Sequence, residues 1–385
     1  MGRRLRVLSV VGTRPNIMKT APVAAELARR PEEFEHVLVH TGQHYDRAMS
    51  AVFLEELGVG EPDHLLGVGS GSHAQQTARV MERLEPLLLE VEPDVVLVPG
   101  DVNSTMAAAL TAAKLWIPVG HVEAGLRSFD RTMPEEVNRV VTDRVADLLF
   151  THSPEARDHL LREGVDGDRI HHVGNTMVDT LVAMRGAIER AGAAAAHGLE
   201  PGSYVVVTLH RPALVDGALL EEALAGLRAV AERMPVVFPV HPRTRAALEA
   251  LGAGGGGERL RLLDPLGYLE FLSLVTTAAG VLTDSGGIQE ETTFLGVPCL
   301  TLRDNTERPV TVELGTNTLL GLSPGRIAEA PDLIADARRR PARVPPLWDG
   351  RAAGRIADVL AGLPRRVSGR ASGPGPPGTI PATSR

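Results

Sequence analysis

The stretch LRVLSVVGTRPNIMK, residues 5–19, sets the pattern of the whole chain. It opens with an apolar, β-branched run at Leu5–Val11, turns at Gly12, and continues with a helix-like segment from Pro15 or Asn16. Proline suits the first position of a helix. A strand that leads through a turn into a helix begins a βαβ unit, so this stretch predicts a parallel sheet. The Gly-x-Gly-x-x-Gly pattern of ordinary dinucleotide binding is absent after this strand.

Short apolar runs of the same kind recur to the end of the chain, most of them before a helix-like stretch. Such an alternation predicts the α/β class, with two Rossmann-like, doubly wound parallel sheets of about six strands each. The predicted strands are Leu5–Val11, His36–His40, Asp94–Val98, Ile117–His121, Leu148–Thr151, Ile170–Val173, Tyr204–Leu209, Val236–Val240, Leu260–Leu263, Gly280–Leu282, Cys299–Leu302 and Thr318–Leu320.

The length of 385 residues exceeds what one hydrophobic core usually serves, so two domains are expected. We predict a first domain at residues 1–174 and a second at 175–350. A helix from Met177 to about Ala196 leads into the second domain. A helix at about 351–363 has apolar residues at helical spacing and is expected to pack back on the first domain. The tail, 364–385, is rich in Ser, Gly and Pro and is expected to be disordered.

Composition narrows the possible functions. The net charge of −8 gives no electrostatic support for nucleic-acid binding. The single cysteine, Cys299, lies in an apolar run and is interpreted as a buried strand residue. The apolar stretch near the amino terminus is too short for a signal peptide or a membrane span, so we expect a cytoplasmic protein without membrane contact. Metal-ligand spacings and cofactor motifs are also missing from the sequence, so neither a metal nor a cofactor is predicted.

Positive side chains follow the first strand. Arg14 lies in the turn and Lys19 one helical turn further on. Open α/β sheets bind ligands where the carboxyl end of a strand meets the start of a helix, and an arginine there can clamp phosphate or hydroxyl groups. The competing interpretation is a solvated arginine and lysine at a surface turn, and for this motif alone the two interpretations are about equal.

A glycine pair opens a helix in the second half, in the segment Asp284–Glu291. The backbone amides at the start of that helix, with the Ser285 hydroxyl, form an anion cradle that fits a diphosphate. Glu291 has two oxygens that can accept hydrogen bonds from vicinal ribose hydroxyls. A capped helix explains the acids equally well, but it does not require Gly286 and Gly287.

Acidic residues follow two strands that we expect to be neighbours. Asp101 and Glu123 both lie at carboxyl ends of strands, and we expect them to couple so that the pKa of one is raised. Helix capping is the competing interpretation, and it is the better one for Asp101 alone. Glu135 and Glu136 follow Pro134 at a helix start, and the helix dipole accounts for them structurally.

Basic residues follow strands of the second half. His210-Arg211 and His241 each come directly after a strand, and a histidine at such an edge can pair with an acid or a phosphate. Arg308 lies in a charged loop after a later strand and is placed to reach the same nucleotide as Ser285. If the two strand edges face each other, phosphate donors lie on one side of a cleft and carboxylates on the other.

Taken together, these motifs resemble the non-hydrolysing UDP-N-acetylglucosamine 2-epimerases, in family order and over residues 5 to about 360. The resembling stretches are Gly12–Pro15 with Lys19, Gly42–His44, Gly100-Asp101, Gly120–Arg127, Pro134–Arg139, Val173–Thr176, His210-Arg211, Pro239–His241, Thr283–Glu291 and Thr306–Pro309.

The resemblance implies a two-domain fold like that of B-type glycosyltransferases and inversion at C2 of the sugar. UDP would be eliminated to leave a bound 2-acetamidoglucal and would then add back, giving UDP-N-acetylmannosamine. The family's catalytic positions correspond here to Asp101, Glu123, Glu135 and His210, with Glu135 assigned by resemblance alone. Its substrate-binding positions correspond to Arg14, Lys19, Phe271 near the uracil, Ser285, Gly286, Gly287, Glu291 and Arg308. Its activator site corresponds to Gln43, His44, Glu136, Arg211 and His241.

Two departures from the family pattern lie near the sugar and activator positions: Asn16–Thr20 after the first turn and Arg211–Ala213 in the second half. They leave open a related UDP-sugar, such as a diacetamido uronic acid nucleotide. The same motifs also fit a hydrolysing 2-epimerase, a B-type glycosyltransferase or a non-catalytic sugar-nucleotide sensor. The resemblance also implies a homodimer that binds UDP-N-acetylglucosamine and UDP.

Overall fold

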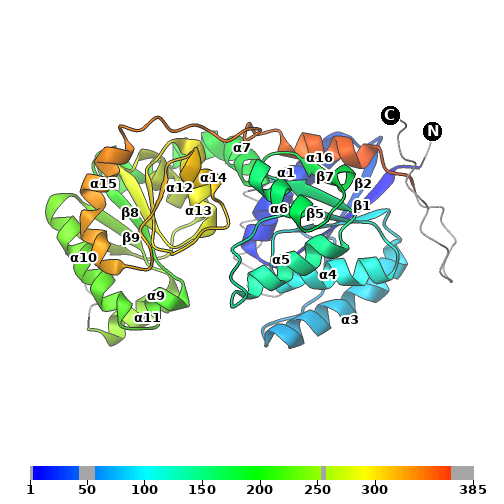
Figure 1. Cartoon of the computed structure of the whole chain (residues 1–385), viewed down its shortest axis with the longest axis horizontal. Helices are drawn as coiled ribbons and strands as arrows, with labels where there is room; N and C mark the ends of the chain where they lie inside the picture. Colours follow the sequence, from blue (N-terminus) through cyan, green and yellow to red (C-terminus); the bar gives the residue numbers. More distant parts are fainter. Residues whose placement is uncertain (1–2, 43–56, 253–256, 366–385) are drawn as a thin grey trace.

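The computed structural model describes residues 3–42, 57–252 and 257–365, and it contains two parallel β-sheets (Figure 1). The strand order of the first sheet is β3-β2-β1-β4-β5-β6-β7, and that of the second is β10-β9-β8-β11-β12-β13. In both sheets the order reverses next to the first strand, as in doubly wound folds. The predicted α/β class with two Rossmann-like sheets is therefore confirmed.

All twelve predicted strands form, and their ends lie within two residues of the predicted ends. The first sheet comprises β1 (Leu5–Val11), β2 (Phe34–His40), β3 (His64–Leu65), β4 (Val95–Pro99), β5 (Val119–Val122), β6 (Leu148–Thr151) and β7 (Ile170–His172). The second comprises β8 (Val205–Thr208), β9 (Val236–Pro239), β10 (Leu260–Leu263), β11 (Gly280–Thr283), β12 (Cys299–Thr301) and β13 (Asn317–Leu319). The strand that the sequence did not predict, β3, is a two-residue addition at the edge beside β2.

Helices cover both faces of each sheet. In the first half these are α1 (Arg14–Arg29), α3 (His73–Val91), α4 (Asn103–Lys114), α5 (Pro134–Val145) and α6 (Pro154–Arg162). The two halves are joined by α7 (Thr176–Ala191), which is followed by α8 (Ala193–Ala196). The second half contains α9 (Pro212–Val215), α10 (Leu219–Arg233), α11 (Pro242–Ala250), α12 (Tyr268–Thr277), α13 (Gly286–Leu295), α14 (Val310–Glu313) and α15 (Ala330–Ala337), and α16 (Ala352–Ala361) follows them.

Alternate residues of a buried strand pack into two different hydrophobic clusters, one on each face of the sheet. In β1, Leu5 and Val7 pack with α1 and α16, whereas Leu8 and Val10 pack with α3 and α4. Strand β8 divides its valines between two clusters in the same way. Strands buried on both faces need continuous apolar runs, which explains why the sequence marks them so clearly.

One long helix from Met177 to about Ala196 was predicted, and this prediction is wrong at one position. Gly192 adopts a left-handed conformation with φ of 55°, which ends α7 and starts the short α8. Glycine is the residue that most readily ends a helix in this way. The polyalanine composition hid this break, because alanine favours helix on both sides of it.

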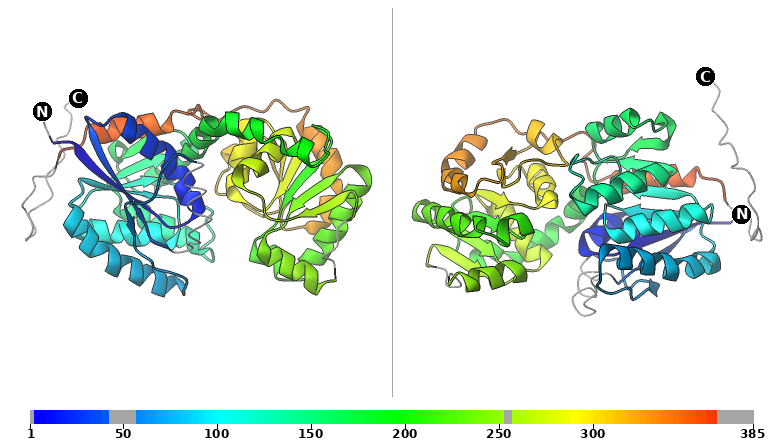
Figure 2. Two further views of the ribbon diagram at one scale, coloured as in Figure 1. Left: turned by 180° about the vertical axis from the view of Figure 1, so that it is seen from behind. Right: turned by 60° about the horizontal axis from the view of Figure 1, so that its bottom comes forward.

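The chain crosses between the sheets twice, and both crossings run along the same side of the molecule (Figures 1 and 2). The crossings meet where Gly174, with φ of 91°, packs against the backbone of Leu347. Beyond this point α16 lies against α1 and the first sheet. Its first amides donate hydrogen bonds to Asp179 of α7, at 3.1 Å from Ala352 and 2.7 Å from Ala353.

Among the described residues, no helix combines the length and the apolar character that crossing a lipid bilayer requires. Cys299 is buried in β12, as expected, and burial raises the pKa of its thiol to about 11. The residues from 366 onward, which include most of the tail predicted to be disordered, lie outside the described part of the chain.

Candidate active site

The carboxyl ends of both sheets border a common cavity of about 390 Å³ between the two halves. The first half contributes the start of α1, the loop after β4 and the first turns of α5, and the second contributes α12, the start of α13 and the loops after β8 and β12. The residues singled out from the sequence that line this cavity are Lys19, Asp101, Glu135, Arg211, Phe271, Ser285, Gly286, Gly287, Glu291 and Arg308.

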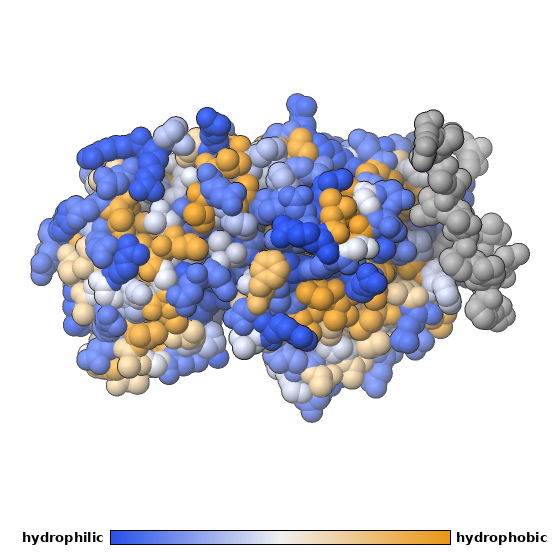
Figure 3. Space-filling view, in the orientation of Figure 1, coloured by the Kyte–Doolittle hydropathy of each residue, from blue (hydrophilic) through white to orange (hydrophobic). Residues whose placement is uncertain are grey.

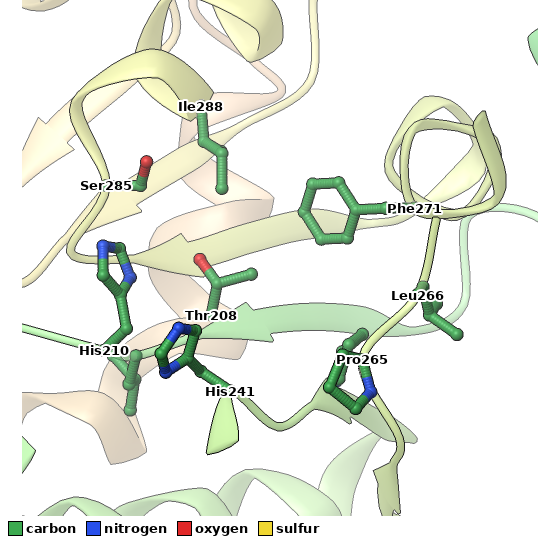
Figure 4. A pocket seen from close by; sticks show the side chains of 10 residues that line it. Thr208, His210, His241, Pro265, Leu266, Phe271, Ser285 and Ile288 are labelled. Atoms are coloured by element: carbon green, nitrogen blue, oxygen red, sulfur yellow. The ribbon is translucent and has the colours of Figure 1, made fainter. Parts of the chain in front are cut away.

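A second cavity of about 250 Å³ adjoins the first and shares Phe271, Ser285 and Ile288 with it. In Figure 4 the Phe271 ring points into this space, and Pro265 lies below the ring. His210 and His241 lie beside each other across the space, with ring centroids 6.1 Å apart. The walls expose far more apolar than polar surface, so the cavity suits a flat ring system with a few polar edges.

Helix α13 begins at the junction of the two cavities. Its N-cap residue, Ser285, places no side-chain cap on the first amides. A Cβ at Gly286 would lie 2.7 Å from Nη1 of Arg308, so only glycine lets this arginine approach the helix start. Gly287 has no neighbour within 4 Å of its would-be Cβ and therefore leaves room for a ligand. Open amides, a helix dipole and an arginine together form an anion site.

Glu291 is buried beside this anion site and accepts a hydrogen bond of 3.0 Å from the Tyr268 hydroxyl. Burial, together with the neighbouring Glu290, raises the pKa of Glu291 to about 8, although the Tyr268 hydrogen bond works in the opposite direction. Near neutral pH this carboxyl group therefore holds a proton, and it can both donate and accept hydrogen bonds.

Asp101 stands partly exposed in the cavity wall, and two side chains of α5 hold it in place. Arg139 donates a hydrogen bond of 2.6 Å to its carboxylate, and Asn138 donates one of 2.9 Å to its backbone carbonyl. Val102, not Asp101, is the N-cap residue of the following helix. The capping interpretation therefore does not apply to Asp101, whose carboxylate borders the cavity.

Glu123 lies behind the cavity wall. It forms ion pairs with Lys19 of its own half and with Arg308 of the second half. Burial tends to raise the pKa of Glu123, but the positive charges of Lys19 and Arg308 outweigh it and hold the pKa below its ordinary value. The prediction that coupling to Asp101 raises one pKa is thus wrong for Glu123. The acid that acts most strongly on it is Glu290 of α13, because the two share the Arg308 guanidinium.

His210 is paired with a buried acid. Its Nδ1 lies 2.9 Å from Oδ1 of Asp284, and the other carboxylate oxygen accepts hydrogen bonds from the backbone amides of His210 and Arg211. Burial tends to raise the pKa of Asp284, but these hydrogen bonds lower it further than burial raises it. An ionised partner at Nδ1 leaves Nε2 as the nitrogen that can exchange a proton with a ligand.

The remaining predicted residues are distributed around the site. Glu135 is exposed at the cavity, and its charge acts on Arg211 across it. Glu136 faces away and binds Arg139 at 2.9 Å, so it supports the wall. Arg14 is exposed at the start of α1 and does not line either cavity, although its neighbour Pro15 does. Gln43 and His44 lie outside the described residues.

Several wall residues were not assigned a role from the sequence. Tyr268 supports Glu291, while Glu290 and Glu307 surround Arg308. Arg139 and Glu290 lie inside the stretches Pro134–Arg139 and Thr283–Glu291, and membership of these motifs could have identified them as site residues. Tyr268 gave no signal, because its partner Glu291 lies 23 positions away on another helix.

Known proteins with similar sequences are 2-epimerases of UDP-sugars. A family model described as UDP-N-acetylglucosamine 2-epimerase matches residues 25–361. The UDP-N-acetylglucosamine 2-epimerase of Methanocaldococcus jannaschii is 40% identical over 365 residues, which span 92% of this chain and 99% of that protein. The UDP-2,3-diacetamido-2,3-dideoxy-D-glucuronate 2-epimerase of Pseudomonas aeruginosa is 40% identical over 331 residues, spanning 85% of this chain and 91% of that protein.

A solved structure shares the fold. The crystal structure of the Methanocaldococcus jannaschii UDP-GlcNAc 2-epimerase in complex with UDP-GlcNAc and UDP superposes with a TM-score of 0.81. The two chains are 38% identical, and the match covers 92% of this chain and 99% of the other.

Proposed function

The chain belongs to the UDP-N-acetylglucosamine 2-epimerase family, and on that premise we propose that it interconverts UDP-N-acetylglucosamine and UDP-N-acetylmannosamine without net hydrolysis. One observation carries the proposal. Two acids of the first half, Asp101 after β4 and Glu135 in α5, line the same cavity as the anion site of the second half at Ser285–Gly287. We place the reaction in the cytoplasm.

The nucleotide fits the second half of the molecule. We place the uracil in the smaller cavity beside Phe271 and the ribose hydroxyls at Glu291. The diphosphate then lies at the start of α13, where open amides and Arg308 offset its charge. This placement turns the sugar toward Asp101 and Lys19 in the first half.

The proposed chemistry is an elimination followed by an addition. A base removes the C2 proton, the C1–O bond breaks, and UDP leaves with the electron pair as the 2-acetamidoglucal forms. The C2 proton is not acidic, so the reaction needs a positioned base and a stabilised leaving group. Asp101, Glu135 and His210 are the side chains placed to transfer protons, and Glu123 holds Lys19 and Arg308 beside them. UDP then adds back after reprotonation on the opposite face.

Proton NMR of UDP-N-acetylglucosamine with the enzyme in D₂O tests the proposal. We expect deuterium at C2 and a mixture of gluco and manno forms. Unlabelled substrate after long incubation with folded enzyme would contradict it and would favour a sensor. Free N-acetylmannosamine that accumulates one-for-one with UDP would instead identify a hydrolysing enzyme.

A related UDP-sugar is the second candidate substrate. The relative from Pseudomonas aeruginosa, which is named for a diacetamido glucuronate substrate, favours this candidate, because its sequence identity of 40% equals that of the relative from Methanocaldococcus jannaschii. Comparing kcat/KM for the two UDP-sugars decides between them. A higher kcat/KM for the diacetamido uronate nucleotide would show that this nucleotide, and not UDP-N-acetylglucosamine, is the substrate.

We also propose a homodimer formed through the layer of α3, α4 and α5. Large apolar side chains are exposed on or beside these helices: Trp116 is 61% exposed, Phe129 71% and Leu89 58%, and Val137 and Val140 are also exposed. Figure 3 shows apolar surface over this layer. Contiguous apolar surface of this kind marks protein contacts. Light scattering tests this proposal. We expect the mass of a dimer for the unmutated chain and the mass of a monomer for the Val140→Asp variant.

A further inference from the structure

His121 lies in the middle of β5, and its ring is completely buried. One ring nitrogen, Nδ1, lies 2.6 Å from Oδ1 of Asp143 on α5. The other, Nε2, lies 2.7 Å from the carbonyl oxygen of Gly100, in the loop that carries Asp101. The ring therefore spans the distance between a helix and a loop of the candidate site.

Both partners of this ring are acceptors. A backbone carbonyl has no hydrogen to donate. Asp143 also accepts hydrogen bonds from the Arg127 guanidinium at 2.7 Å and from the Gly125 amide at 3.1 Å, and these donors favour an ionised carboxylate that only accepts. Two acceptors at hydrogen-bond distance require a hydrogen on each ring nitrogen, which makes the ring an imidazolium.

Asp143 extends the connection to the second acidic loop. Its Oδ2 accepts hydrogen bonds from the Gly125 amide at 3.1 Å and from Arg127 at 2.7 Å. Arg127 in turn forms two hydrogen bonds of 2.7 Å with Glu163, at the end of α6. The loop that begins with Glu123 is thus tied to the same carboxylate that holds His121.

Gly100 lies where a small shift matters. Its φ is 65°, and a Cβ there would lie 3.0 Å from Nζ of Lys19 and 3.5 Å from Oε2 of Glu123. The peptide held by His121 is therefore packed among the charged groups of the site. Any movement of its carbonyl moves Asp101, the next residue along the chain.

We propose that His121 is a positioning residue for the reaction. Its doubly protonated ring holds the Asp101 loop directly and the Glu123 loop through Asp143, and so fixes the distance between the two loops. The proposal rests on the function proposed above. It assigns His121 no contact with the substrate, because the ring is fully buried and both of its nitrogens are engaged by the protein.

Nitrogen-15 NMR of the histidine-labelled, unmutated chain tests the protonation directly. Near neutral pH we expect both nitrogens of His121 to carry hydrogens, because each of them faces an acceptor. His36 is the internal reference: burial lowers its pKa to about 4, so it should show one bare nitrogen. The signals of His121 are assigned by their loss in His121→Gln. A bare nitrogen on His121 would overturn the proposal, whether or not the chain turns over UDP-N-acetylglucosamine.

Two substitutions then test the positioning role. A glutamine amide nitrogen replaces Nε2 and can still reach Gly100, whereas an asparagine nitrogen replaces Nδ1 and reaches only Asp143. We expect His121→Asn to lower kcat roughly 100-fold, the effect of a misplaced reacting group, and His121→Gln to lower it much less. The affinity for UDP, held by the other half, should change little in both variants, which also shows that they fold. Equal losses of kcat in the two variants would reduce His121 to a packing residue.

Discussion

Arg308 and Glu123 form an ion pair of 3.0 Å that joins the two halves of the molecule, although they lie 185 positions apart in the chain. The same guanidinium lies 2.9 Å from Glu290 and 3.4 Å from Glu307. Three carboxylates thus share one buried cation at the entrance to the anion site. A diphosphate that binds here must compete with these carboxylates for Arg308.

Replacing Arg308 by methionine should destabilise the fold as well as weaken nucleotide binding. Removing one partner of a buried ion pair leaves uncompensated charge and costs about 3–5 kcal/mol. Urea denaturation measures the shift in the unfolding midpoint. Arg233→Met is the matched control, because its ion pair with Asp332 is exposed to solvent and contributes little to stability. Similar small shifts in both variants would show that the Arg308 cluster is not a stabilising contact.

Asp101→Asn should lower turnover by about 10²–10⁴-fold, because the variant loses a proton-transferring group. The amide oxygen can still accept the hydrogen bond from Arg139, so the loop should keep its place. UDP titration calorimetry should therefore give an affinity close to that of the unmutated chain. Equal losses of turnover and of UDP affinity would make Asp101 a binding or structural residue. Asp168→Asn, at an exposed position of the 3-10 helix Gly167–Arg169, serves as the control.

Glu291 should make the protein less stable as the pH rises. The unfolded chain releases the Glu291 proton near its ordinary pKa, whereas the folded chain keeps it up to about pH 8. Between these values the folded state binds more protons, so the free energy of unfolding falls with rising pH. In Glu291→Gln this part of the decline is absent, and the variant should gain stability relative to the unmutated chain between about pH 5 and about pH 8.

Denaturation at several pH values measures the effect, with the exposed Glu249→Gln as the control. If Glu291→Gln and the unmutated chain lose stability in parallel, Glu291 is already ionised in the folded protein.

Gly174→Ala should disrupt the junction of the two chain crossings. The added Cβ would lie 2.0 Å from the carbonyl oxygen of Leu347, and φ of 91° is unfavourable for alanine. Strain and overpacking together predict a loss of about 2–5 kcal/mol. Gly164→Ala is the control, since it has φ of 81° but no neighbour within 4 Å, so it should lose only about 1–2 kcal/mol. Equal losses, measured by denaturation, would mean that the contact with Leu347 relaxes freely.

The sequence was sufficient to predict most of the strands but not the contacts among the elements. Strands such as Leu5–Val11 were predictable because burial on both faces demands an unbroken apolar run. The two-residue strand His64–Leu65 was missed because so short a segment has no periodicity. The positions of Asp101 and Glu123 at neighbouring strand ends were predictable from parallel pairing alone.

The pairing of these acids was not predictable. Glu123 finds its cations at Lys19 and Arg308, which are 104 and 185 positions away. These ion pairs depend on how the two halves pack together and on Gly286, which lets Arg308 approach the start of α13. No local sequence pattern predicts this packing. The same holds for His121, whose role depends on a carbonyl across the sheet and an acid on α5.

The docking of α16 also sets the order in which the molecule can be completed during synthesis. Ala353, Ile356, Ala357 and Leu360 form one wall of the core beneath β1 and β4, yet the ribosome makes them after the strands of both sheets. The second sheet, whose final strand ends at Leu319, has all its strands before that wall exists. A nascent chain therefore carries an unfinished first core until α16 emerges, although the strands of that core are made before those of the second sheet.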